Sequence, residues 1–177
     1  MKQNIIDKFK KFEEDTDLLL TKLTSISDEK LSMKPEGNWS ILQVLFHLNE
    51  AETASLKYMK KKVQAGNKMG EIGLLNRLQM KVTNVALGSS LKWKAPSYIS
   101  NPKAPETIEE VKNQWKKTRS EIMDFIEEYP EEYLDKLVYK HPMAGRQNLE
   151  NAVDSFIFHQ KHHLHQIRRI KKSLDIQ

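Results

Sequence analysis

The sequence predicts an all-α protein built as a four-helix bundle. Four long segments carry apolar residues at every third or fourth position, which is the period of an amphipathic helix. The sequence contains neither convincing strand-like alternation nor an internal repeat. With 177 residues, 38% hydrophobic and 30% charged, the chain has the size and composition of one globular domain, and we assign residues 1–177 to it.

The first helix is predicted from Asn4 to about Ser27. Its apolar stripe advances in steps of four and three, with Thr16 completing the pattern: Ile5, Phe9, Phe12, Leu19, Leu23 and Ile26. Residues 28–34 can add a turn or two of helix. The helical pattern then breaks at Pro35-Glu36-Gly37-Asn38.

The second helix has a clear start and should run to about Gln64. Ser40 and Gln43 have the spacing of a capping box, and Trp39 precedes them at the position of a hydrophobic staple. The inward stripe of this helix is predicted to be Ile41, Val44, Leu48, Ala51, Ala54 and Tyr58. His47 lies on the same stripe, where a core residue is expected.

A long connection, residues 65–105, links the second helix to the third. A structureless loop of this length is unusual in a compact domain, so we predict a further helix over residues 72–87. Beyond it, Trp93, Tyr98 and several prolines indicate an extended segment, which either walls a pocket or covers the core. This partly helical connection argues against a simple up-down-up-down bundle.

The third helix is predicted to begin at Thr107, with Glu110 as its capping-box partner, and to end at Pro130. Its buried face consists of Ile108, Val111, Trp115, Ile122, Phe125 and Ile126. We predict a short helix over residues 131–138 and a turn over residues 141–146. The fourth helix should run from about Asn148 to Ser173.

Four of the six histidines lie in the fourth helix. At about 100° per residue, His159 and His163 fall inside its apolar stripe, His162 lies to one side, and His165 points towards solvent. Together with His47 they would place three imidazoles in the interior. Two interpretations remain open: neutral buried histidines satisfied by hydrogen bonds, or a three-histidine metal site of the catalytic type.

Other polar residues near these histidines have weaker claims to a role. Glu50 and Glu52 lie off the central stripe, so a solvated helix flank is favoured over contact with a metal ligand. Gln166 is a second group that could orient a ligand. The sequence contains no repeated Glu-x-x-His pattern, no His-Glu-x-x-His motif and no glycine-rich phosphate loop. The sequence therefore gives no support for a di-iron site, a metalloprotease or a nucleotide-binding protein.

Composition excludes several further classes of function. The chain has no cysteine, which rules out disulfides and thiolate metal sites. No apolar run has the roughly 18 residues of a membrane span, and residues 1–4 lack a signal peptide's apolar core, so we expect a cytoplasmic protein without a membrane partner. The net charge is +5, but lysines are mixed with acidic residues, and no nucleic-acid partner is expected.

Three stretches resemble the DinB/YfiT-like family. Residues 38–48 are similar to its W-S-…-H-L stretch, residues 141–145 to its H-P-…-G turn, and residues 159–167 to its final-helix signature, all in the expected order. The resemblance covers nearly the entire chain. It implies up-down-down-up topology, a homodimer, and a divalent metal, usually zinc or nickel, held by His47, His159 and His163. It gives His141 no ligand role, and a hydrogen bond within its turn is expected instead.

The resemblance leaves the reaction open. Members of the superfamily include transferases and isomerases that use low-molecular-weight thiols such as bacillithiol, mycothiol or glutathione, and proteins described as metal-dependent hydrolases. A three-histidine metal lowers the pKa of bound water or thiol, which yields a nucleophile near neutral pH. We expect a metal-dependent enzyme with a small-molecule substrate and favour thiol-dependent S-transfer over hydrolysis. A non-catalytic metal-binding bundle is the third alternative.

Overall fold

The computed structural model describes residues 1–66, 69–73, 103, 105–142 and 144–176. Four long helices make up most of this structure: α1 (Lys2–Leu23), α3 (Ile41–Val63), α5 (Ile108–Glu128) and α6 (Leu149–Ser173). A short helix, α2 (Asp28–Ser32), lies between α1 and α3. The predicted four-helix bundle is confirmed. The helix predicted over residues 72–87 and the extended segment beyond it fall almost entirely outside the described residues.

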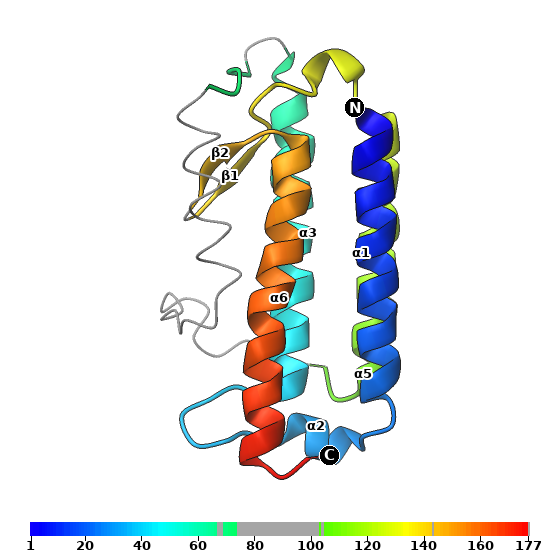
Figure 1. Cartoon of the computed structure of the whole chain (residues 1–177), viewed down its shortest axis with the longest axis vertical. Coiled ribbons are helices and arrows are strands. Elements are labelled where there is room, and N and C mark those ends of the chain that lie inside the picture. The colour runs from blue at the N-terminus through cyan, green and yellow to red at the C-terminus, as the bar shows by residue number, and fades with distance from the viewer. Residues whose placement is uncertain (67–68, 74–102, 104, 143, 177) are drawn as a thin grey trace.

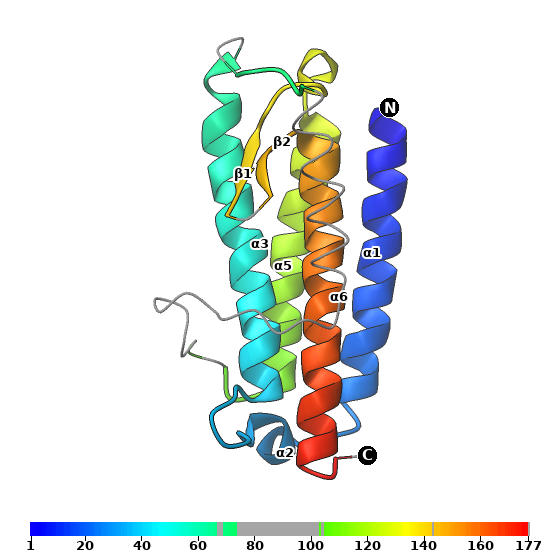
Figure 2. The same ribbon diagram turned by 60° about the vertical axis from the view of Figure 1, so that its left-hand side comes forward.

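The direction of the long helices gives the bundle its topology. In Figure 1, α1 and α6 run down the page, whereas α3 and α5 run up it. The order along the chain is therefore up-down-down-up, as predicted, and the consecutive long helices α3 and α5 are parallel. Figure 2 shows the same four helices from a second side. None of the described helices is both long and apolar enough to cross a membrane.

The starts of α3 and α5 follow the sequence closely. Ser40 Oγ accepts a hydrogen bond from the Gln43 backbone N–H at 3.2 Å, and Gln43 Oε1 accepts one from the Ser40 N–H at 3.1 Å. Thr107 and Glu110 form the equivalent pair at α5. Both predicted capping boxes are confirmed, and each satisfies backbone donors that the first turn leaves free.

The end of α1 differs from the prediction. The helix stops at Leu23, and a short turn leads to Ser27, which is itself the N-cap of α2 and accepts a hydrogen bond from the Lys30 N–H. An N-cap residue adopts an extended backbone, so α1 could not continue through it. The turn or two of extra helix predicted over residues 28–34 is present as α2.

A small β-hairpin precedes α6 and was not predicted. Its strands, β1 (Tyr139–His141) and β2 (Gly145–Gln147), pair antiparallel, with His141 opposite Gly145. The helix predicted over residues 131–138 is wrong beyond one 3-10 turn, Glu131–Tyr133. The physical reason is that the Val138 N–H donates to the Gln147 carbonyl at 2.9 Å, which draws this backbone into strand-like pairing. The predicted turn connects the two strands.

The bundle interior consists of two hydrophobic clusters with polar residues between them. One cluster includes Phe9, Leu56 and Ile126, and the other includes Leu20 and Trp115. Between these clusters, buried polar side chains from all four long helices form a layer that hydrogen bonds connect. We call these residues the central polar layer: Thr16, Glu52, Arg119 and Gln160, each no more than 4% exposed.

Glu52 is the centre of this layer, which corrects its assignment to a solvated flank. Its carboxylate accepts hydrogen bonds from Arg119 Nε at 2.6 Å, Arg119 Nη2 at 2.9 Å and the Trp115 indole N–H at 3.0 Å. The inward face of α3 therefore passes through Glu52, and Ala54 and Tyr58, which were predicted to lie on it, are exposed. A buried carboxylate is tolerated here because a guanidinium pairs with it and its oxygens are hydrogen-bonded.

Candidate metal centre

Three histidines from two helices converge on one point. His47 comes from α3, and His159 and His163 lie one turn apart on α6. The Nε2 atom of His159 is 3.3 Å from Nε2 of His47 and 3.1 Å from Nε2 of His163. His163 is buried and the other two are partly exposed. The structure thus brings together the three residues that the sequence singled out.

The spacing of these nitrogens fits a bound divalent cation. A tetrahedral ion with metal–nitrogen distances of about 2.0–2.1 Å holds its ligand nitrogens about 3.3 Å apart. The rings also meet at steep angles, 83° for His47 with His159 and 76° for His159 with His163, so their edges face a common point. Hydrogen bonds among the three rings cannot satisfy all of these facing nitrogens, because each neutral imidazole has only one N–H to donate.

Gln166 sets the orientation of His163. Its Oε1 lies 2.7 Å from His163 Nδ1, and an amide oxygen only accepts, so Nδ1 carries the proton and donates. The Nε2 atom of His163 is then left with a free lone pair, directed at the other two histidines. Gln166 therefore lies where it can orient a ligand, the role that the sequence suggested for it.

The surroundings keep the three imidazoles neutral. Burial lowers the pKa of His47 to about 4. Burial, and then the neighbouring histidines, which disfavour a further positive charge, lower the pKa of His163 to about 3 and that of His159 well below its usual value. At neutral pH all three rings are in the unprotonated state that binds a metal.

Trp39 forms one wall of the centre, a role that its expected position as a staple residue did not indicate. Its ring lies 5.1 Å from that of His47, between centroids, and is nearly parallel to that of His163, at 6.3 Å and 9°. The Ser40 capping box fixes the backbone next to Trp39. Local sequence carries the signal for the cap but not for the contact with His163, which lies on another helix.

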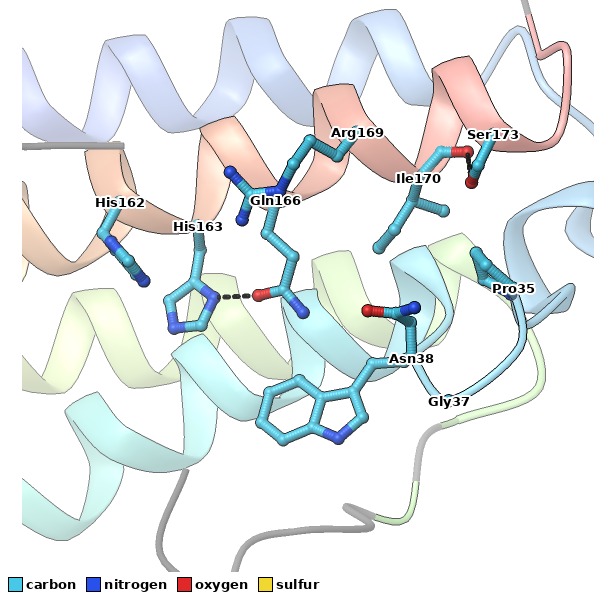
Figure 3. A pocket seen from close by; sticks show the side chains of 10 residues that line it. Pro35, Gly37, Asn38, His162, His163, Gln166, Arg169, Ile170 and Ser173 are labelled. Atoms are coloured by element: carbon cyan, nitrogen blue, oxygen red, sulfur yellow. Dashed lines mark hydrogen bonds between the residues drawn. The ribbon is translucent and has the colours of Figure 1, made fainter. Parts of the chain in front are cut away.

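A cavity of about 340 Å³ opens beside His163. It lies between α6 and the loop before α3 (Figure 3) and is lined by Pro35, Gly37, Asn38, Trp39, His162, His163, Gln166, Arg169, Ile170 and Ser173. Its volume is within the range of small-molecule sites. Arg169 is a lining residue that sequence reasoning missed, because only the folded loop brings residues 35–39 against the end of α6.

The remaining histidines and Glu50 lie mostly where the sequence put them. His162 flanks His163, with ring centroids 5.2 Å apart. His141 Nδ1 accepts a hydrogen bond from the Ala144 N–H at 3.0 Å, the turn-stabilising contact expected of it. Glu50 is exposed on α3. His165 is partly buried, so its predicted exposure is only partial.

We expect Gln166→Ala to weaken zinc binding about 10- to 100-fold, because His163 loses the acceptor that fixes its tautomer and ring orientation. Gln166→Glu is the matched variant: it retains an acceptor at this position and should keep tight binding. Competition with a chromophoric chelator measures both affinities. Equal affinities for Gln166→Ala and the parent protein would contradict the orienting role.

The chain is similar to known proteins along most of its length. It is 27% identical over 154 residues to the uncharacterized protein YuaE of Bacillus subtilis, covering 86% of this chain and 90% of YuaE. The structure matches that of YfiT from Bacillus subtilis with a TM-score of 0.60 at 14% identity, over 99% of this chain and 89% of YfiT. YfiT is described as a probable metal-dependent hydrolase with an unusual four-helix bundle topology.

The family match includes all three converging histidines. The model of the DinB superfamily matches residues 11–167, which contain α3, α5 and the part of α6 that bears His159 and His163. The match spans most of the 177 residues. The chain belongs to the DinB superfamily.

Proposed function

We propose that this protein is a metal-dependent enzyme that holds a divalent cation with His47, His159 and His163. The observation that carries the proposal is the convergence of three neutral imidazoles. The Nε2 atom of His159 lies 3.3 Å from Nε2 of His47 and 3.1 Å from Nε2 of His163. A cation bound there supplies Lewis acidity that makes water or a thiol nucleophilic near neutral pH. The shared fold with YfiT, itself described as a probable metal-dependent hydrolase, supports this reading at a coarse level.

The protein's own residues have separable tasks in this proposal. The three histidines bind the cation, and three protein ligands are the number that catalytic sites use, because a further position stays available. Gln166 holds His163 in the binding tautomer. Trp39 covers one side of the histidines and limits access of water, while the cavity next to His163 admits a small molecule.

The proposal has different versions, according to which metal is bound and which nucleophile it activates. Zinc and nickel are both compatible with three imidazoles, and ligand chemistry does not choose between them. Water as the nucleophile makes the protein a hydrolase. A low-molecular-weight thiol makes it an S-transferase, the version that we favour. These two versions differ in the co-substrate that they require.

Activity assays with and without metal test the proposal. The metal-loaded protein is assayed against ester and amide substrates without thiol, and against electrophiles such as chlorodinitrobenzene with glutathione or cysteine. We expect turnover in one arm that disappears with chelator, returns on adding zinc or nickel, and is absent from His159→Ala. Turnover in the ester or amide arm identifies a hydrolase, and turnover only with thiol identifies an S-transferase.

A negative result is also informative. A protein that binds about one metal per chain but is inactive in both arms with a broad panel would be a non-catalytic metal-binding bundle, and the enzymatic proposal would be wrong. Activity that survives complete removal of metal would equally contradict it. His165→Ala is the matched control, because this histidine lies on the same helix outside the cluster.

A further inference from the structure

We infer that the cavity beside His163 binds the oxyanion group of a small molecule, with Arg169 as the charge partner. This inference rests on the proposed function, because it assigns a substrate class to the same site. The shared chemistry is a carboxylate or a phosphate. Both match the planar fork of a guanidinium, which donates two parallel hydrogen bonds to either group.

The lining of the cavity is suited to an anion. Its ten residues include no aspartate or glutamate, so no negative side chain in the wall repels an anion. The side-chain amides of Asn38 and Gln166 supply neutral N–H donors, and Arg169 supplies positive charge. Glu36 belongs to the same loop as Asn38, but it is exposed and is not part of the wall.

Arg169 is available to bind such a group. Within the described part of the chain, the lysines and arginines in ion pairs are Lys8, Lys11, Lys112, Arg119 and Lys136, and Arg169 has no carboxylate partner. Its side chain turns back along α6 in the direction of His162 and His163 (Figure 3).

The position of Arg169 places the oxyanion of the ligand. The Arg169 backbone lies about 9 Å along the helix from that of His163, but the Arg169 side chain turns back towards His163 (Figure 3). An oxyanion bound by Arg169 therefore lies on the side of the cavity next to the histidine cluster, where the proposed reaction takes place. The inferred substrate or co-substrate is thus a small organic acid or phosphate.

Binding of simple anions tests the inference directly. The probes are succinate and inorganic phosphate, with the uncharged analogue succinamide, each titrated at constant ionic strength into zinc-loaded and metal-free protein. The reporter is the Trp39 indole N–H signal in nitrogen-15 NMR spectra, assigned with Trp39→Phe. We expect succinate or phosphate to shift this signal in both forms of the protein. The stronger of the two identifies the preferred oxyanion.

Variants of two adjacent arginines separate a specific site from general surface charge. Arg169→Gln should weaken binding of the preferred anion at least about 10-fold, and Arg169→Lys should weaken it less, because a lysine keeps the charge but loses the fork. Arg168→Gln removes the same charge from the neighbouring residue, which is exposed like Arg169 but lies outside the cavity, and should change affinity less than about twofold.

Three outcomes would overturn the inference: equal weakening by Arg168→Gln and Arg169→Gln, equal binding of succinamide and succinate, or no effect of either anion on Trp39. The experiment also distinguishes this inference from the proposed function. Arg169-dependent anion binding by a protein that fails to bind metal would refute the metal site and leave the anion site standing. Metal-dependent turnover without Arg169-dependent anion binding would refute the anion site and leave the metal site standing.

Discussion

Replacing His159 with alanine should abolish stoichiometric metal binding. His159 is the residue whose Nε2 lies within 3.3 Å of both other imidazole nitrogens, so its loss leaves His47 and His163 as a two-ligand remnant. Removing an orienting partner alone weakens metal sites by 10- to 100-fold, and we expect loss of a ligand to exceed about 100-fold. Elemental analysis of protein purified without an affinity tag should fall from about one divalent metal per chain to a small fraction of that.

The control for this result is His165→Ala. His165 lies on the same helix and is partly buried, but it is not in the cluster, so metal content should remain at the parent level. Circular dichroism should show unchanged helix content for both variants. Full metal occupancy in His159→Ala would show that His159 is not a ligand, and a metal-free parent protein would show that the cluster is a set of buried neutral histidines.

Replacing Glu52 with alanine should destabilise the fold by about 3–5 kcal/mol, the usual result of breaking a buried ion pair by removing one partner. Arg119 is 4% exposed, and its charge would be left among Phe12, Trp115 and Gln160. The Trp115 indole N–H would also lose its acceptor. Urea unfolding followed by circular dichroism measures the change in the free energy of unfolding.

Two comparisons make this prediction specific to the buried pair. Glu50→Ala, an exposed glutamate on the same helix, should change stability by less than about 0.5 kcal/mol. The double variant Glu52→Leu/Arg119→Met, which removes both charges and fills the space with apolar groups, should recover much of the lost stability. A Glu52→Ala protein as stable as Glu50→Ala would show that the pair contributes nothing.

The helices and the pairing of His159 with His163 were predictable because their signals are local, whereas the link to His47 came from its inward position on another helix and from the family resemblance. The capping boxes at Ser40 and Thr107 lie within four residues each, and the stripes of α1 and α5 repeat over their whole length. His159 and His163 share a face by spacing alone. These features need no knowledge of the partner helix.

The features that escaped prediction depend on partners distant in sequence. Glu52 looks like a surface residue on α3 because its neighbours in the apolar pattern do not indicate Arg119, which lies 67 residues away. The strands around His141 are three residues each, too short for alternation to be visible. Trp39 and Arg169 line the site only because the loop before α3 folds against the end of α6.

Adjacent residues of α6 connect the histidine cluster to the central polar layer. His159 faces His47, whereas the next residue, Gln160, accepts hydrogen bonds from Thr16 at 2.9 Å and from Arg119 at 3.4 Å. Any rotation of α6 about its own axis would break the Gln160 contacts and, at the same time, move His159 away from His47. The angular setting of this helix is therefore fixed before any ion arrives. The helix therefore loses little conformational entropy when the histidines coordinate an ion, and this preorganisation favours tight metal binding.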